Sequence, residues 1–275
     1  MKKIICTILL VVFKVFICEG VSIKKVKIPL DNYHGIPYSV ERTSYFIDGF
    51  DVDDNDYFYF LGGNKPVLTC FKNDTLIKRK AIKEFYSNKI YVFKDHIYVF
   101  DTKYNRSNLY VLNCKNIEIE ITKKIIYKDL NNITFVDSTL ILESIDLNLN
   151  KSYSLFSLNG RFKQMVNNAY NLPIKLYSNL EINNLIYLGQ ISYNYLFFKN
   201  DFKEHKFVFE LINNLGNIVN KKSLDNNISG IPFNESSNEH IKLRNQHIYI
   251  LGRNNQDALI SVISVKDLFN SIDTH

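Results

Sequence analysis

The sequence predicts an all-β fold, a β-propeller made of four-stranded antiparallel blades. Three observations support this prediction: a strand motif that recurs along the chain, an aromatic content of 14%, and the absence of any long stretch with the 3.6-residue periodicity of a helix. Tyr and Phe side chains favour the pleated, half-buried surface of a sheet. With 275 residues, 46% of them hydrophobic, the chain is long enough for a substantial core and too apolar for a disordered protein.

The recurring motif is a short run of apolar residues that we call the anchor strand. The centres of successive anchor strands are 39, 43, 56 and 52 positions apart, a range that brackets the repeat length of propeller blades. Two longer intervals, at 163–181 and 221–239, leave room for a sixth, degenerate blade, so we expect five or six blades. The central residues of the anchor strands are Tyr59, Tyr98, Ile141, Phe197 and Tyr249.

Three further strands are predicted around each anchor strand. A ring of such four-stranded units covers both apolar faces of every sheet, whereas a single unit leaves them exposed. The segment 24–30 is expected to add a strand to the last unit and to close the ring; a pair of β-sandwiches is the alternative. The strands before the anchors are predicted at 45–52, 90–93, 133–136, 185–188 and 241–243, the third strands at 67–71, 109–112, 154–158, 207–211 and 259–265, and the fourth strands at 76–77, 117–121, 161–166, 217–220 and 268–269.

Residues 50–61, with the sequence FDVDDNDYFYFL, lead through 67–71 to a turn at Asn73-Asp74 and resemble a blade of the NHL type, as found in secreted six-bladed propellers of bacteria. The segment 155–162, LFSLNGRF, repeats the same strand-and-turn pattern. Gly62-Gly63 after a strand resembles a kelch blade, but kelch blades carry a Trp and this chain has none, so that type ranks second. The resemblance covers most of 26–272. It implies a binding scaffold more often than an enzyme, and no particular substrate.

Residues 1–20 have the pattern of a secretory signal peptide. Lys2 and Lys3 precede an apolar run at 4–13, and Cys18-Glu19-Gly20 offers small residues for cleavage. Lys14 interrupts the apolar stretch before the roughly 20 residues that a membrane span requires. We therefore expect a single domain at 21–275 that is secreted, periplasmic or at the cell surface, with no membrane span in the mature chain. A lipid anchor on Cys18 is the less favoured alternative.

After removal of this leader, Cys70 and Cys114 are the remaining cysteines. An oxidising compartment would allow them to form a disulfide. We place them in corresponding strands of neighbouring units, which should hold their Cα atoms beyond the limit of about 7 Å for a disulfide. Two separate buried thiols are therefore the favoured interpretation, and the disulfide is the alternative.

The charges predict neither a nucleic-acid partner nor a metal site. The 34 Lys and Arg alternate with the 28 Asp and Glu instead of gathering in one stripe. Asp51, Asp53 and Asn55 have the spacing of a calcium loop, but Asp56 stands where that loop needs Gly, and Gly62 where it needs Glu. We predict a hairpin turn there in preference to a calcium site or a catalytic carboxylate. No metal-ligand spacing, phosphate loop or nucleophile elbow is found, so no metal and no cofactor are expected.

The connections that follow the anchor strands should emerge together on one face of the ring, which we call the loop face. They are polar and carry mixed charges, and loops on a rigid scaffold often hold binding residues. Our leading hypothesis is a non-enzymatic scaffold that binds a protein or glycan through this face. The alternatives are a glycan hydrolase or lyase with carboxylates in the central funnel, and a purely structural protein with ordinary solvated loops. The ligand contacts that we select are Tyr104, Arg106, His205 and Arg253.

Overall fold

The structure is a computed structural model that describes residues 21–269 except for 42–43, 48, 64–65, 83–88, 104–105, 126–129, 137–138, 146–147, 149, 158–160, 167–184 and 232–239. Within this part of the chain, no helix is long and apolar enough to cross a membrane. The expected leader at 1–20 lies outside the described residues, as does the Asn159-Gly160 turn.

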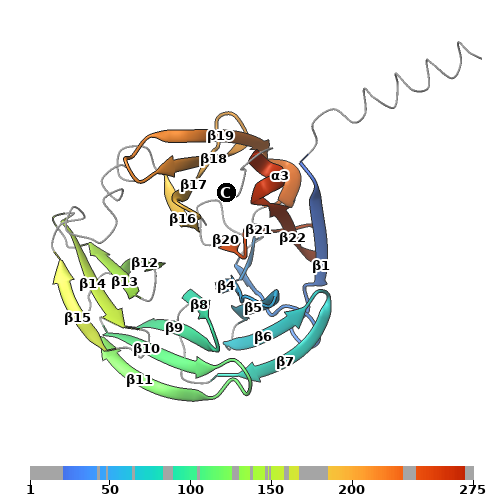
Figure 1. The fold of residues 1–275 in the computed structure, drawn as a ribbon. Coiled ribbons are helices and arrows are strands. Elements are labelled where there is room, and N and C mark those ends of the chain that lie inside the picture. Colours follow the sequence, from blue (N-terminus) through green and yellow to red (C-terminus); the bar gives the residue numbers. More distant parts are fainter. Residues whose placement is uncertain are drawn as a thin grey trace, which may run out of the picture.

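The described residues form five four-stranded antiparallel sheets, which stand around a ring (Figure 1). Sheet I consists of β4 (Gly49–Val52), β5 (Tyr57–Gly62), β6 (Val67–Lys72) and β7 (Thr75–Ala81), and sheet II of β8 (Lys89–Phe93), β9 (His96–Lys103), β10 (Arg106–Asn113) and β11 (Ile119–Ile125). Sheet III consists of β12 (Leu130–Val136), β13 (Thr139–Ile145), β14 (Lys151–Ser157) and β15 (Phe162–Val166), and sheet IV of β16 (Ile186–Ile191), β17 (Asn194–Asp201), β18 (Lys206–Asn213) and β19 (Ile218–Asp225).

Sheet V combines the two ends of the described chain. Its order is β20 (Ile241–Arg244), β21 (His247–Arg253), β22 (Asp257–Ser264) and then β1 (Ile23–Pro29), which pairs with β22 over its whole length. The predicted closure of the ring by the N-terminal strand is thereby confirmed. A small ribbon of β2 (Ser39–Glu41) and β3 (Ser44–Phe46) follows β1 and stands outside the five sheets.

The all-β prediction and the arrangement of the repeats are confirmed, and the alternative of two β-sandwiches is wrong. All five anchor strands are the second strand of their sheet: β5, β9, β13, β17 and β21. Four of the sheets also share a feature that the sequence did not predict, a register shift between the third and fourth strands at Cys70/Phe71, Val111/Leu112, Leu155/Phe156 and Leu211/Ile212. Because a bulge increases the local twist of a strand, its recurrence bends the outer edges of these sheets alike.

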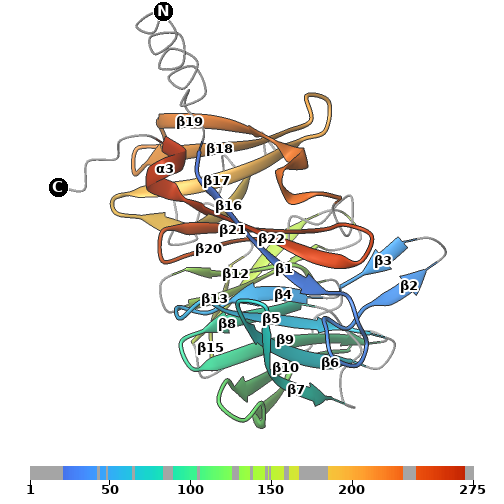
Figure 2. The ribbon, with the colours of Figure 1, turned by 90° about the vertical axis from the view of Figure 1, so that its right-hand side faces the viewer.

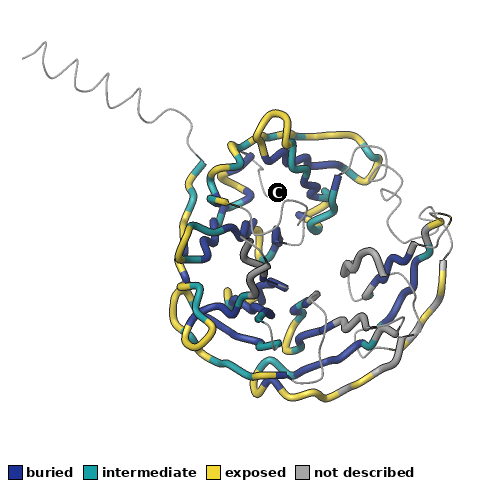
Figure 3. Tube along the Cα trace, turned by 180° about the vertical axis from the view of Figure 1, so that it is seen from behind, coloured by how far each residue is buried: buried dark blue, intermediate teal, exposed yellow. Residues whose placement is uncertain are grey.

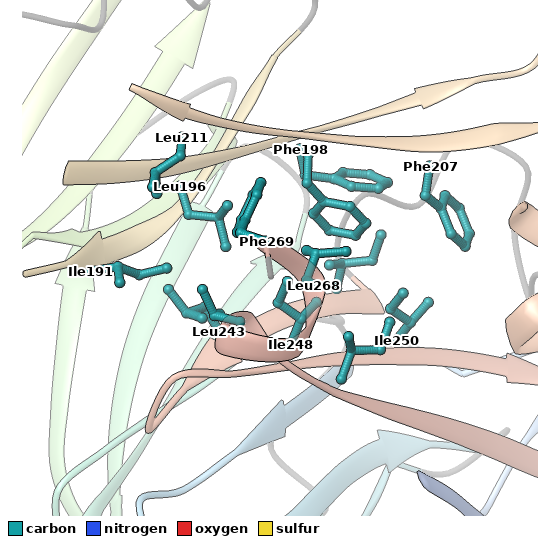
Figure 4. Packing of buried hydrophobic residues seen from close by; sticks show 14 residues of the cluster. Ile191, Leu196, Phe198, Phe207, Leu211, Leu243, Ile248, Ile250, Leu268 and Phe269 are labelled. Carbon is teal, nitrogen blue, oxygen red and sulfur yellow. The ribbon is translucent and has the colours of Figure 1, made fainter. Parts of the chain in front are cut away.

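The predicted strand at 268–269 is wrong. These residues belong to the helix α3 (Val265–Phe269), because β1 already occupies the outer position of sheet V and leaves no partner for a further strand. The buried side chains of Leu268 and Phe269 instead fill the space between sheets IV and V, against Phe198 and Ile248 among others (Figure 4).

The apolar core lies between neighbouring sheets. One cluster joins sheets V and I, a second sheets IV and V, a third sheets I and II, and a fourth sheets III and IV. Burial follows the same pattern, with buried residues along the middle strands and exposed ones at the outer edges and turns (Figure 3). Successive side chains of a middle strand point to opposite faces of its sheet, and each face packs against a neighbouring sheet. Both faces are therefore apolar, which explains the short, continuous apolar runs in the sequence.

Replacing Ile28 by Ala tests the closure of the ring. Ile28 lies in β1 and is fully buried in the cluster between sheets V and I. Its truncation should lower the free energy of unfolding by about 2–5 kcal/mol, as in any tightly packed core. The exposed neighbour Lys27 is the control, and Lys27→Ala should change the stability by less than about 0.5 kcal/mol. Equal, small effects in urea titrations of both variants would show that β1 does not hold the ring closed.

Candidate functional site

A largely buried ion pair joins β4 and β20, two of the innermost strands of the ring. The Asp51 side chain is 0% exposed, and its Oδ2 and Oδ1 lie 3.0 and 3.3 Å from Nη2 of Arg244. The carboxylate also accepts hydrogen bonds from the backbone N–H groups of Val92, at 2.6 Å, and Val52, at 2.8 Å. A buried carboxylate is tolerated only with such complete pairing.

The guanidinium of Arg244 extends this network across three sheets. Its Nε donates to the carbonyl of Val52 at 2.9 Å, Nη1 to its own neighbour Leu243 at 2.9 Å, and Nη2 to Val92 at 3.0 Å. The pair thus joins the first strands of sheets V, I and II, which are the innermost strands of the ring. This network was not predicted from the sequence; Asp51 within the otherwise uncharged segment GFDV and Arg244 at the end of IKLR were the available signal.

The inner strands do not bring together the carboxylates that a glycosidase needs. Within the bounds of the five described inner strands, Asp51 is the one acidic residue, and Arg244 with two backbone N–H groups binds it. Lys242 of β20 is buried, and its Nζ lies 4.6 Å from the ring centroid of Tyr91 in β8. The described centre is therefore cationic, and two carboxylates flanking a sugar bond do not converge there.

The acidic run after Asp51 forms the hairpin turn that the sequence predicts. Asp53 accepts hydrogen bonds from the N–H groups of Asn55, at 2.8 Å, and Tyr57, at 2.9 Å. The turn also contacts sheet V, since Asn245 donates to the carbonyl of Asp54 and the Tyr249 hydroxyl donates to Asp56. Burial and the neighbouring Asp56 raise the pKa of Tyr249. Among the described residues, no three His, Cys, Asp or Glu side chains lie close enough to hold a metal ion.

The two thiols are free and meet at one tyrosine between sheets I and II. The Tyr59 hydroxyl donates a hydrogen bond of 3.3 Å to Oδ2 of Asp53, and burial together with the nearby Cys114 and Cys70 raises the pKa of this hydroxyl. Burial raises the pKa of Cys70 to about 11 and that of Cys114 to about 12. The separate thiols are thus confirmed. The predicted position of Cys114 is wrong: it follows β10 in a turn and is half-buried.

Two of the four selected contact residues lie at the ends of one short segment of the loop face. The carbonyl of His205, an exposed residue with φ 53°, accepts a hydrogen bond from the N–H of Asn226 at 3.0 Å. Asn226 begins the 3₁₀ helix η2 (Asn226–Ser229), after which Ile231 and Arg253 exchange two backbone hydrogen bonds of 2.8 Å. Tyr104 lies outside the described residues. Arg106 is the first residue of β10, and its side chain is not described.

The segment 226–231 is held tightly against sheet V. The Ser261 hydroxyl donates to the carbonyl of Ile228 at 3.0 Å. A Cβ atom at Gly252 would clash with the carbonyl of Ser229, and one at Gly230, whose φ is 74°, with the carbonyl of Arg253. Only Gly fits where two backbones approach so closely. The segment therefore presents its outward side chains from a fixed backbone.

The loop face also exposes large apolar side chains that the sequence analysis did not select. Phe202 follows β17 and is 56% exposed, and Ile231 is 50% exposed. Tyr33 is 79% exposed and belongs to the segment after β1, which the hydrogen bond from Leu30 N–H to the Gln256 carbonyl ties to the turn between β21 and β22. Figure 2 shows these connections at one side of the ring, seen edge-on. An apolar residue within a polar loop, such as Phe202, was the signal available in the sequence.

Comparisons with known proteins find likeness in structure alone. No family model matches the chain, and no curated protein matches its sequence. A crystal structure of glutaminyl cyclase from Myxococcus xanthus aligns with a TM-score of 0.48 and 12% identity over 87% of this chain and 97% of that one. The Dos1 propeller aligns at 0.37 and 12% over 91% and 71%, and BamB from Moraxella catarrhalis at 0.34 and 10% over 92% and 99%. Similarity of this degree assigns no activity or partner, and the fold rests on the strand pairing of this chain.

A double-mutant cycle on Asp51 and Arg244 tests the central ion pair. Asp51→Ala leaves the guanidinium of Arg244, whose side chain is 21% exposed, without its counter-ion and should cost about 3 kcal/mol of stability, the lower end of the range for buried pairs. The double variant Asp51→Ala/Arg244→Met should cost about 1–3 kcal/mol less than the sum of the single variants. Asp54→Ala, at an exposed position of the next turn, should stay within about 0.5 kcal/mol of the wild type. Additive effects in the cycle would contradict the coupling of the two residues.

The environment of Cys70 and Cys114 predicts two thiols that react slowly. At pH 8 both remain protonated because their pKa values are raised to about 11 and 12, and the thiolate is the reactive form. In a Cys6→Ser/Cys18→Ser background, Ellman's reagent should modify both thiols more than tenfold faster in guanidinium than in the native protein. Fewer than two titratable thiols in the unfolded, non-reduced protein would reveal a disulfide and contradict the structure.

Proposed function

We propose that this protein is a secreted, non-enzymatic β-propeller that binds a protein or glycan partner through its loop face. The observation that carries the proposal is the set of exposed apolar side chains, Phe202, Ile231 and Tyr33, on backbone that hydrogen bonds hold fixed. The three residues belong to connections on one face of the ring, and exposed apolar surface that polar residues surround is typical of interaction sites. A fixed backbone lowers the entropy lost on binding.

His205 and Arg253 supply the polar part of this surface. Their shared connection through η2 keeps them on the same side of the ring as Phe202 and Ile231. A ligand that covers the segment 226–231 would meet an imidazole at one end and a guanidinium at the other. Tyr104 and Arg106 remain part of the proposal as further contacts, and Arg106 begins β10 of sheet II.

The proposal includes the compartment and the type of repeat. Residues 1–20 act as the signal peptide, and 21–275 form a single propeller domain of NHL type with five or six blades outside the cytoplasm. The lysines at positions 2 and 3 and the apolar run at 4–13 support the signal peptide. The segments 50–61 and 155–162, which resemble parts of a blade, support the repeat type. The glycan hydrolase or lyase is the less favoured candidate, because Asp51 is bound by Arg244 and backbone N–H groups.

Two exposed aromatic residues at opposite ends of one strand test the proposal. Phe202 follows β17 on the loop face, and Tyr193, 82% exposed, precedes β17 at the other end. On an array of neutral glycans, Phe202→Ser should reduce binding at least tenfold, and Tyr193→Ser should leave it unchanged. Bound glycan at 100 times its dissociation constant should also stabilise the wild type by about 2.7 kcal/mol.

If no glycan binds, a photo-crosslinker at position 202, with position 193 as the control, tests the protein partner. Adducts formed from position 202 alone would support the loop face. Equal labelling from both positions, or loss of glycan binding in Tyr193→Ser alone, would contradict it.

A further inference from the structure

The outer edge of the ring concentrates positive charge. The outermost strands of the five sheets, β1, β7, β11, β15 and β19, contain 11 Lys and Arg but only two Asp and Glu, whereas the whole chain has 34 against 28. The even alternation of charges along the sequence hides this imbalance, because an outer strand returns only once in each repeat. Folding therefore sorts the charges into a basic rim.

Two neighbouring strands of this rim, β1 and β7, are the most basic. Together they hold six Lys and Arg and no acidic residue within their bounds. Lys24, Lys25 and Lys27 on β1 are exposed, and Lys78 and Lys80 on β7 are half-exposed. In the part of the chain that the structure describes, none of these five lysines forms an ion pair. We call these five lysines the basic strip.

Hydrogen bonds from β7 to the segment that follows β1 link the two halves of the basic strip. Arg79 of β7 donates from Nη1 to the carbonyl of Gly35 at 3.1 Å and from Nη2 to that of Asn32, in the segment that follows β1. Asp31 in the same segment attracts Arg79. The Asp31 carboxylate also accepts hydrogen bonds from the backbone N–H groups of Tyr33 and His34. Asp31 and Arg79 thus balance each other and leave the five lysines uncompensated. Figure 1 shows β1 and β7 as the outermost strands of two sheets that follow one another around the ring.

Protection of an open sheet edge explains single lysines and does not explain this strip. A Lys or a Pro on an edge strand is enough to discourage pairing with another chain, and β1 already ends in Pro29. On β19, by contrast, Lys221 is neutralised by Glu210 at 2.8 Å, and an Asp ends the strand. Five uncompensated lysines repel one another, and an anionic partner would relieve this repulsion.

We propose that the basic strip binds an anionic polysaccharide that carries sulfate or carboxylate groups. Lysines on one side of a strand recur about every 6.6 Å, so an extended polymer that lies along β1 meets them in succession. Neither β1 nor β7 contains an aromatic residue, and single-stranded nucleic acids are bound with stacked aromatic rings. Lysines act as point charges, which suits a flexible polyanion. This surface lies on the outer edge of the ring, apart from Phe202 and Ile231 of the loop face.

Heparin as the probe tests the proposal, with neutral dextran as the negative control. Wild-type protein should bind heparin at about 0.1 M salt and should not bind dextran. Lys25→Ser/Lys27→Ser should weaken heparin binding at least tenfold and reduce the slope of log affinity against log salt by about two. The matched control is Lys115→Ser/Lys266→Ser, which removes two exposed lysines elsewhere and should change the affinity less than twofold.

Four results would overturn the proposal. The first is no binding of heparin by the wild type, and the second is an equal loss in the matched control, which would indicate general attraction by the net charge. The third is loss of heparin binding in Phe202→Ser, which would place the site on the loop face. The fourth is tighter binding of single-stranded DNA than of heparin. Failure of glycan binding at the loop face leaves all four readouts unchanged, so the two proposals fail separately.

Discussion

The structure depends on the buried pair of Asp51 and Arg244 at the centre of the ring. The desolvation of a carboxylate and a guanidinium costs several kcal/mol for each ion, and only correct placement of the partners offsets it. Here the partners come from β20, β4 and β8, so three sheets must be in position before the charges are satisfied. The pair is therefore a condition on the arrangement of the sheets more than a source of stability.

The second constraint is closure, which the chain achieves by placing its first and last strands in one sheet. β1 covers the outer edge of β22, and the displaced end of the chain becomes α3, whose Leu268 and Phe269 complete the core between sheets IV and V. The same closure fixes the segment that follows β1, because Leu30 N–H donates to the carbonyl of Gln256 in the turn between β21 and β22. The loop face and the basic strip both depend on it, since each includes residues next to β1.

Local pattern predicted the strands, and long-range contacts account for what it missed. Apolar runs around Tyr59, Tyr98 and Tyr249 located the second strand of each sheet, because burial on both faces leaves a visible signal. The fate of 268–269 depended on β1, more than 200 residues away, and no local pattern reports such competition. The pairing of Asp51 with Arg244 also joins residues that are distant in the sequence, as does the approach of Cys70 and Cys114 to Tyr59. Of the selected contacts, His205 and Arg253 are brought to one segment, but Phe202 and Ile231 required knowledge of exposure.

The central claim is that the ring is one cooperative unit, closed by β1 and fixed by the pair at its centre. Hydrogen exchange followed by mass spectrometry measures this directly, because an element that opens only with the whole fold exchanges at the rate of global unfolding. We predict that the amides of β1 are as protected as those of β4, β20 and β21. Exchange of β1 more than about 100-fold faster than exchange of β21 would contradict the account, since the ring would then open without unfolding.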